Sequence, residues 1–222
     1  MADIQKLREF VQVNGWYLFA EELWSRATRG VRSKLLARRL KTEDLLLGRY
    51  SRLKGLRFLQ VGRDFHAGDS LWIEAVARYG DQVFQPRIVI GNRVRASNWV
   101  HIAATHYVEI GDDCLIGSKV IITDHGHGQY ASGHSSPFEP PAMRRLDSGR
   151  KVVIGRNVWL GDGVVVMPDV TIGEGAVIGS NSIVSKDIPA FTVSVGAPAK
   201  PIKQYDKDSK EWRVLRPRST GA

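Results

Sequence analysis

The sequence predicts an all-β protein whose chain winds into a three-sided coil of about five turns. Three observations lead to this fold class. Aliphatic residues recur every six positions, Gly, Asn and Asp recur in the short stretches between them, and long segments interrupt the repeat at two places. A period of six fits neither an amphipathic helix nor a two-sided strand, so it indicates short flat sides joined by turns.

The first part of the chain, residues 1–57, is expected to be a helical extension. Between residues 4 and 45, Leu, Phe, Val and Trp recur at helical spacings, and the stretch RGVRSKLLARRLK continues as a basic amphipathic segment. We expect this extension to cap the coil. Contact with a partner subunit or with a membrane surface is the alternative role.

The coil itself is expected over residues 58–205, where the repeat of six is regular. Its members are Val61, Ala67 and Ile73, then Ile90, Ala96 and Ile102, then Ile110, Ile116 and Ile122, and finally the series Ile154, Leu160, Val166, Ile172, Ile178 and Val184. We expect each to point into a triangular interior, with turns that use Gly, Asn or Asp where φ is positive. Stacked coils then bury an apolar column that no single coil could bury.

Two segments interrupt the repeat. About eleven surplus residues lie between Ile73 and Ile90, and about 26 are looped out between Ile122 and Ile154. The second segment, about 123–151, opens with TDHGHG and contains several prolines, so we expect an ordered arm. A long loop that leaves a rigid coil is typical of a functional site. The tail, residues 206–222, has little apolar content.

The opening of the arm supplies groups that can carry protons. Histidine is the side chain that most often acts as a general base, so His125 and His127 are candidates for that role, and Asp124 could orient an imidazole. A plain turn with surface histidines is the alternative interpretation.

Charge and composition limit the class of protein. Residues 1–60 carry 13 Lys/Arg against 6 Asp/Glu and residues 201–222 carry 6 against 3, so the basic charge is at the ends. No nucleic-acid motif accompanies it, so we expect no nucleic-acid partner. The single cysteine, Cys114, excludes a disulfide framework, and we see neither an export signal nor an apolar run of 18 residues. We expect a cytoplasmic protein, or one at the inner face of the cytoplasmic membrane.

Several segments together resemble a known family. The hexads, the looped-out arm, NVWLGDGVVVMPDVTIGEGAVIGSNSIVSKDIP and VGAPAKPI are similar to the hexapeptide-repeat acyltransferases, in the sugar and polysaccharide O-acetyltransferase branch. The resemblance covers roughly residues 58–205. It implies a left-handed parallel β-helix and a homotrimer with acetyl-CoA, a co-substrate, in grooves between protomers. It also implies direct acetyl transfer with a histidine as general base, and no metal.

The resemblance also implies roles for single residues. The TDHGH motif favours His125 as the base, whereas a gapless count along the family pattern favours His127. Trp159 in NVWLG matches a tryptophan that walls the groove near the thioester, and Asn98 and Asp124 are candidate contacts to the acceptor. The CoA channel would be lined by Gly161, Ser180 and Ser185, with Lys186, Lys200 and Lys203 near the CoA phosphates.

The longer arm and the basic N-terminus indicate an acceptor larger than a free sugar, such as a lipid-linked saccharide in O-antigen, capsule or exopolysaccharide assembly. An antibiotic O-acetyltransferase shares the same histidine chemistry and stays an alternative. A zinc enzyme of the γ-type carbonic anhydrase kind, with His101, His106 and His125 or His127 as ligands, is a less favoured alternative. A non-catalytic trimeric scaffold is the last.

Overall fold

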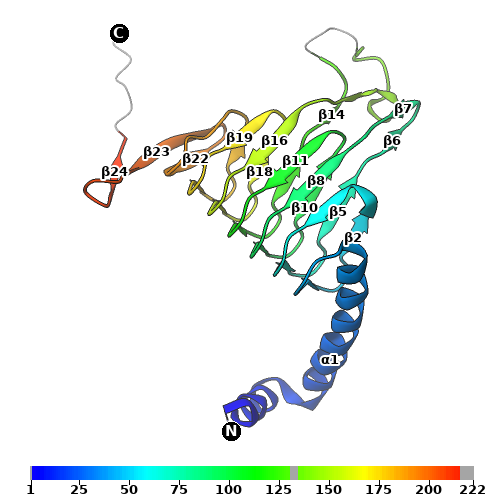
Figure 1. Ribbon diagram of the computed structural model, residues 1–222, viewed down its shortest axis with the longest axis vertical. Helices are drawn as coiled ribbons and strands as arrows, with labels where there is room; N and C mark the ends of the chain where they lie inside the picture. Colours follow the sequence, from blue (N-terminus) through cyan, green and yellow to red (C-terminus); the bar gives the residue numbers. More distant parts are fainter. Residues whose placement is uncertain (1, 131–134, 216–222) are drawn as a thin grey trace.

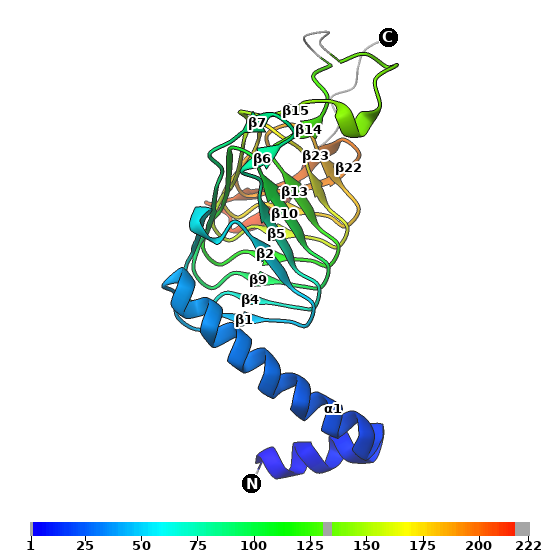
Figure 2. The same cartoon turned by 90° about the vertical axis from the view of Figure 1, so that its right-hand side faces the viewer.

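A computed structural model describes residues 2–130 and 135–215, and its body is a three-sided coil of parallel strands (Figure 1). The chain passes in turn through three sheets, here sheets A, B and C, which form the sides of a prism (Figure 2). The predicted all-β coil is confirmed. Corners A/B, B/C and C/A are the turns that join one sheet to the next.

The strands of the three sheets are short, and in each sheet they stack in chain order. Sheet A contains β1 (Leu46–Leu47), β4 (His66–Ala67), β9 (Arg95–Ala96), β12 (Leu115–Ile116), β17 (Trp159–Leu160), β20 (Val177–Ile178) and β22 (Thr192–Gly196). Sheet B contains β2 (Arg52–Lys54), β5 (Trp72–Ala75), β10 (His101–Ala104), β13 (Ile121–Thr123), β18 (Val165–Val166) and β21 (Ile183–Val184). Sheet C contains β3 (Leu59–Val61), β8 (Arg87–Ile90), β11 (Tyr107–Ile110), β16 (Lys151–Ile154) and β19 (Val170–Ile172).

The predicted interior positions form the core. All six members of the series that begins at Ile154 are at most 1% exposed, and they belong to one buried apolar cluster with the earlier triplets. In-register pairing explains the column, since Ile102 pairs with Ile73 below and Ile122 above. Each coil therefore covers the apolar interior of the one before it.

The predicted turns with positive φ are present, but glycines that directly follow interior residues have another role. Gly161 does not have a positive φ, but a Cβ built on it would lie 2.7 Å from the backbone nitrogen of Ser180 in the next coil. Positive φ angles occur two residues later in the turns, at Gly163 and at Asn157, as well as at non-glycine positions such as Trp99. Close stacking of the coils requires the first type of glycine.

The N-terminal extension is one long element, helix α1 (Ala2–Leu40), with non-helical φ and ψ at Gly15 that divide it in two. It lies at one end of the coil, beneath β1 (Figure 2). The coil begins earlier than the predicted boundary at residue 58, because β1 and β2 already pair in parallel with β4 and β5. No described helix combines the length and the apolar character needed to cross a bilayer.

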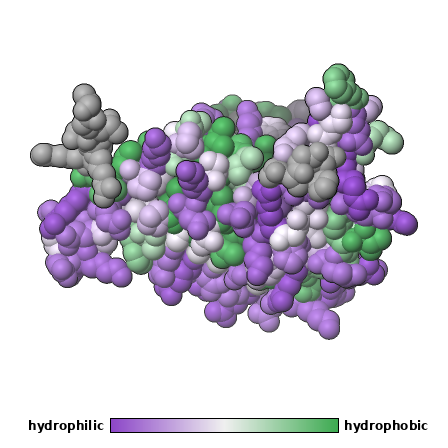
Figure 3. All heavy atoms as spheres, turned by 90° about the horizontal axis from the view of Figure 1, so that it is seen from above, coloured by the Kyte–Doolittle hydropathy of each residue, from purple (hydrophilic) through white to green (hydrophobic). Residues whose placement is uncertain are grey.

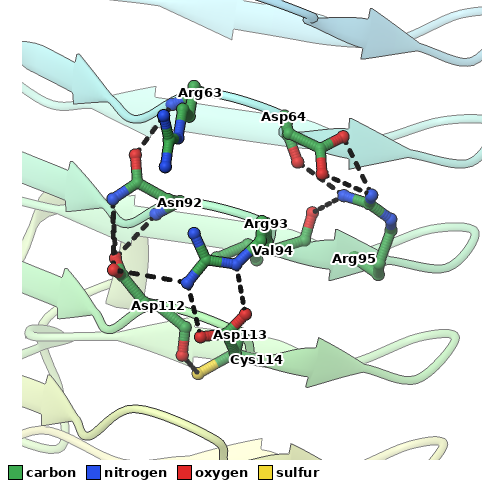
Figure 4. A network of polar contacts seen from close by, with 9 residues as sticks. All are labelled: Arg63, Asp64, Asn92, Arg93, Val94, Arg95, Asp112, Asp113 and Cys114. Atoms are coloured by element: carbon green, nitrogen blue, oxygen red, sulfur yellow. Dashed lines mark hydrogen bonds and ion pairs between the residues drawn. The ribbon is translucent and has the colours of Figure 1, made fainter.

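Corner C/A is held by a ladder of polar contacts (Figure 4). Asp112 accepts a hydrogen bond from the backbone of Asn92 at 2.7 Å, and the Asn92 side chain in turn accepts one from the backbone of Arg63 at 3.0 Å. Arg93 forms a bidentate ion pair with Asp113. These contacts satisfy turn amides that have no ladder partner.

Additional strands and two single 3₁₀ turns complete the described chain. The surplus segment after Ile73 forms the hairpin of β6 (Arg78–Tyr79) and β7 (Gln82–Val83), and the arm contains the antiparallel pair β14 (Gly126–His127) and β15 (Leu146–Asp147). The 3₁₀ turns are Leu56–Phe58 and Pro141–Met143. At the other end, β23 (Ala199–Asp206) and β24 (Glu211–Val214) extend sheet A with antiparallel strands, so the tail is structured at least to residue 214.

Candidate active site

The arm begins at corner B/C with a buried carboxylate. Asp124 follows β13 directly, is fully buried, and accepts hydrogen bonds from the backbone N–H groups of Thr105, His106 and Tyr107 at 2.8–2.9 Å. These three amides belong to the same corner of the coil below. Asp124 therefore fixes the point at which the arm leaves the coil.

Asp124 also orients His125. The Nδ1 atom of His125 lies 2.8 Å from Oδ1 of Asp124, and the imidazole is only 12% exposed. Burial raises the pKa of the Asp124 carboxyl, but the hydrogen bonds from His125, Thr105 and His106 outweigh burial, so this pKa lies below its ordinary value. An ionised carboxylate only accepts hydrogen bonds, so Nδ1 of His125 carries a proton, and in the neutral ring Nε2 has a free lone pair.

His127 is oriented by a different partner. Its Nδ1 atom lies 3.2 Å from the hydroxyl of Tyr79, and the two rings meet edge to face. The Tyr79 hydroxyl donates its one proton to the carbonyl of Ala142 at 2.6 Å. It can then only accept from His127, so Nε2 of His127 is also unprotonated in the neutral ring. The partner of His127 is a neutral phenol, which stabilises an imidazolium less than the Asp124 carboxylate does.

The two interruptions of the repeat come together in space. Gln82 in the β6–β7 hairpin donates to the carbonyl of Leu146 at 3.1 Å and accepts from its N–H at 2.7 Å. Arg145 pairs with Asp81 at the same contact. The hairpin therefore supports the returning strand of the arm, and a cavity of about 240 Å³ lies between residues 79–82 and 142–145.

The arm also has its own internal support. Arg144 is buried, and it donates to the carbonyl of Glu139 at 2.9 Å and to the hydroxyl of Tyr130 at 2.8 Å. Its guanidinium lies over the Tyr130 ring. The expected ordered arm agrees with these contacts in its described part.

His101 lies on the outer face of sheet B, one strand below the strand that ends in the arm. Its ring stacks on Trp72 at 4.2 Å between centroids, and its buried Nε2 atom has no hydrogen-bond partner among the described residues. Burial lowers the pKa of His101, the Glu74 carboxylate opposes this, and the nearby His125 adds to the lowering. From the sequence, His101 was expected only as a ligand of the alternative zinc site. The described residues contain no cluster of three His, Cys, Asp or Glu that could hold a metal ion. The histidines expected as zinc ligands therefore do not form a metal site among these residues.

Five of the seven residues expected along the CoA channel lie on sheet A or at the adjoining corner A/B. Trp159 faces outward, is 51% exposed, and pairs with Val177, which pairs with Val193, which pairs with Lys203. This column spans three strand spacings, on the order of 14 Å. Gly161 and Ser180 stack on each other at the adjoining corner A/B, and Lys200 lies on β23 with Lys203.

The remaining expected residues are divided between the two corners of sheet B. Asn98 is at corner A/B, where its side-chain oxygen accepts from the N–H of Asp69 at 2.7 Å and so stabilises a turn. Ser185 and Lys186 follow β21 at corner B/C, two strands along from the corner that holds Asp124.

Within one chain, the expected site residues therefore form two groups. His125 lies at corner B/C, whereas Trp159, Gly161 and Ser180 lie on sheet A and corner A/B. Corners A/B and B/C lie at the two ends of the sheet B strands, on the order of 15 Å apart. Seen from above, the surface between the arm and the C-terminal hairpin is mostly hydrophilic with hydrophobic side chains in its middle (Figure 3).

Cys114 does not belong to either group. It is buried in the core, its Sγ lies 3.1 Å from the carbonyl oxygen of Gly155, and burial raises the pKa of its thiol to about 11. A thiol of this kind is a poor nucleophile near neutral pH.

Comparisons with known proteins agree with this fold. Residues 151–186 match the family described as bacterial transferase hexapeptide (six repeats). WbbJ of Escherichia coli, named as a lipopolysaccharide biosynthesis O-acetyl transferase, is 42% identical over 69% of this chain and 76% of its own length. The dTDP-4-amino-4,6-dideoxy-D-glucose acyltransferase of Escherichia coli is 34% identical over 76% of this chain and 94% of its own length.

A drug-modifying enzyme and a crystal structure extend the comparison. The chloramphenicol acetyltransferase of Klebsiella aerogenes is 32% identical over 81% of this chain and 76% of its own length. A mutant of AntD, an N-acyltransferase from Bacillus cereus crystallised with dTDP-4-amino-4,6-dideoxyglucose and coenzyme A, superposes with a TM-score of 0.60 over 76% of this chain and 84% of its own, at 18% identity.

The fold and these relatives define a left-handed parallel β-helix of the acyltransferase type. The chain belongs to the bacterial hexapeptide-repeat transferase family, and it is an acyltransferase.

Proposed function

We propose that this protein transfers the acetyl group of acetyl-CoA to a hydroxyl group of a sugar, with His125 as general base. The observation that carries this proposal is the pairing of His125 with the buried Asp124 carboxylate, which leaves the Nε2 lone pair free at the start of the arm. His127 is the second candidate base, and its weaker partner Tyr79 makes it the less favoured one.

In the proposed reaction, Nε2 of His125 takes the proton of the acceptor hydroxyl as the hydroxyl oxygen attacks the thioester carbonyl carbon. Asp124 stabilises the imidazolium that forms. The tetrahedral intermediate collapses as the C–S bond breaks, and the CoA thiolate takes the proton from Nε2. No covalent enzyme intermediate is needed, and binding both substrates in one groove supplies much of the rate.

We further propose that the site lies between two protomers of a homotrimer. The expected residues divide into two groups, one at corner B/C and the other on sheet A and at corner A/B, and this division supports the proposal. A three-fold arrangement would place corner B/C of one protomer, which holds His125, against sheet A of the next protomer, which holds Trp159.

Acetyl-CoA fits the sheet A side of this groove. Trp159 and the outward Val177 and Val193 provide an apolar floor, and Lys203 and Lys200 supply positive charge at its end for the CoA phosphates. Gly161 and Ser180 are small residues at corner A/B, so the pantetheine part of CoA could approach the backbone there. Ser185 and Lys186 lie at corner B/C, on the same side of the coil as His125. Any contact they make with CoA would therefore be to the CoA molecule bound on sheet A of the neighbouring protomer.

For the acceptor, we propose a saccharide of cell-surface polysaccharide assembly, free or lipid-linked. The relationship to WbbJ, together with the long arm that the β6–β7 hairpin supports, favours this class. Asn98 and Asp124 stay candidates for acceptor contact, although the observed hydrogen bonds give both a structural role. We place the reaction in the cytoplasm, at the inner face of the membrane where a lipid-linked acceptor would be exposed.

A second candidate function is acetylation of an antibiotic hydroxyl. The identity of 32% to a chloramphenicol acetyltransferase over 81% of this chain favours it, and the same histidine chemistry would serve.

The test is a thiol-release assay with acetyl-CoA and a panel of sugars, nucleotide-linked aminosugars, lipid-linked oligosaccharides and chloramphenicol. Turnover on a saccharide hydroxyl that is lost in His125→Ala and kept in His127→Ala supports the proposal. Turnover on chloramphenicol alone favours the second function. Turnover on an aminosugar alone would mean that the enzyme acetylates an amine and not a hydroxyl group. Acetyl transfer that survives both substitutions overturns the proposed chemistry.

A further inference from the structure

Helix α1 is attached to the β-helix by one of its faces. On this face Ser33 accepts a hydrogen bond from the backbone of Leu47 at 3.1 Å, and Arg32 donates to the carbonyl of Ser51. Leu36, Ala37 and Leu40 pack against the core from the same side. Further along, Glu21 forms an ion pair with Arg49 at 3.3 Å. The helix therefore has a defined orientation against the end of the coil.

The opposite face of α1 carries an exposed apolar stripe. Apart from the adjacent pair Trp16 and Tyr17, its members recur three, four or seven residues apart: Trp16, Tyr17, Ala20, Trp24, Val31 and Leu35. Of these, Trp16, Tyr17, Trp24, Val31 and Leu35 are 74%, 80%, 74%, 63% and 59% exposed. Residues two apart on a helix point about 200° away from each other, so Val31 and Leu35 face away from the body when Ser33 and Ala37 face it. This stripe is much larger than the isolated apolar residues of an ordinary surface.

Positive charge lies next to one end of the stripe. Residues 23–42 contain seven Lys or Arg and no Asp or Glu. Lys34 and Arg38 follow Val31 and Leu35 at a spacing of three, so they continue the stripe on the same face, and both are exposed. Among the side chains that the structure describes, this face of α1 is therefore apolar along the stripe and carries Lys34 and Arg38 at the end that joins the coil.

Charge favours one of two possible binding partners of this face, a second copy of the chain or a lipid surface. Packing the stripe against the same stripe of a second copy would bring together two helices that each carry seven Lys or Arg over residues 23–42. The acidic residues along the stripe are Glu21 and Glu22, and Glu21 already pairs with Arg49. An anionic lipid surface complements that charge, and each basic residue near such a surface contributes favourably. Trp and Tyr are also the side chains that favour the headgroup region of a bilayer.

We propose that the apolar stripe of α1, with Lys34 and Arg38, is a docking surface for an anionic phospholipid membrane. The helix lies in the plane of the interface with the stripe inserted, and the coil stands on its cytoplasmic side. The break at Gly15, with φ 80° and ψ 164°, lets the first part of α1 leave the line of the second (Figure 1). The stripe from Trp16 to Leu35 then meets the lipid as one straight segment.

The experiment is co-sedimentation of the full chain with vesicles of phosphatidylcholine alone or with added phosphatidylglycerol, at low and high salt. The chain is expected to bind the anionic vesicles, and salt is expected to weaken this binding. Trp16→Gln with Val31→Gln should reduce the partition coefficient by roughly tenfold or more. Lys34→Gln with Arg38→Gln should reduce it by roughly twentyfold at low salt. The matched control is Trp212→Gln with Val214→Gln, which replaces the same residue types on β24, at the other end of the molecule, and should bind like the wild type.

Equal binding to neutral and anionic vesicles, or equal loss in the stripe and control variants, would overturn the proposal. A stripe variant whose mass by light scattering falls while its vesicle binding is unchanged would show that the stripe covers a second copy instead. Thiol release on a water-soluble acceptor should be the same in all these variants. Failure of membrane docking is therefore distinct from failure of the proposed acetyl transfer.

Discussion

The imidazole of His125 is hydrogen-bonded through Nδ1 to the carboxylate of its own sequence neighbour, Asp124, at 2.8 Å. Neighbours in an extended strand point to opposite faces, so this pairing requires the chain to turn. The turn occurs because Asp124 is held by three amides of the coil below. One carboxylate thus fixes the arm and orients the proposed base.

Asp124→Asn should lower kcat by roughly a thousandfold, because an amide can donate to Nδ1 and so favour the wrong tautomer of His125. It should also lower the free energy of unfolding by about 1–3 kcal/mol, since the amide accepts fewer backbone hydrogen bonds. Kinetics and urea unfolding measure the two effects. Asp112→Asn is the matched control, because Asp112 also accepts turn amides but lies at corner C/A. An equal loss of kcat in both variants would mean that Asp124 acts only through stability.

His125→Ala should lower kcat by roughly 10²–10⁴ and leave the affinity for CoA unchanged, because a general base acts on the acceptor proton. His127→Ala should change kcat by less than tenfold. Steady-state kinetics and calorimetric titration with CoA provide the measurements. The reverse ranking of the two variants would assign the base to His127.

Gln82→Ala should loosen the arm without unfolding the coil. It removes both side-chain hydrogen bonds to Leu146, and each costs about 1 kcal/mol of local stability. Hydrogen exchange should rise in the arm around residues 142–147 and stay unchanged in β16 and β19. We expect the KM for the acceptor to rise with it. Uniformly faster exchange over the whole coil would contradict the supporting role of the hairpin.

His101 should make stability depend on pH. Its pKa is lowered in the folded protein by burial, so below its ordinary value near 6.5 the unfolded chain binds more protons. The free energy of unfolding should therefore fall as pH decreases from about 7.5 towards 5.5. His101→Phe keeps a ring against Trp72 and should flatten this dependence. Urea unfolding across that pH range is the measurement, and an unchanged slope in the variant would rule out His101 as its source.

The repeat of six allowed the coil to be predicted from sequence because each position of the series from Val61 to Val184 carries an aliphatic side chain that the structure places in the core. The first coil was missed, although Leu47 and Leu53 are six apart, because the helical spacing that precedes them extends to residue 45. The structure places both leucines in the stack through β1 and β2. The turns with positive φ at Gly, Asn or Asp were predicted correctly, as at Asn157 and Gly163. The need for Gly161 could not be predicted, because the approach of a neighbouring backbone leaves no pattern in the sequence of a single coil.

The candidate site was less predictable than the coil. Asp124 and His125 could be named from TDHGHG, but their mutual hydrogen bond depends on amides 17–19 residues earlier. Tyr79 and Gln82 had no sequence signal beyond the surplus length of their segment. Their contacts with the arm join positions 48 and 64 residues apart, and only the folded coil sets that register.

A site shared between protomers is tested most directly by complementation between His125→Ala and Trp159→Ala. Each variant alone should be nearly inactive, and the two should be mixed, unfolded together and refolded. If each site combines His125 of one protomer with Trp159 of the next, random trimers made from equal amounts should regain about a quarter of the wild-type activity. A mixture no more active than its two parents would contradict a site shared between protomers.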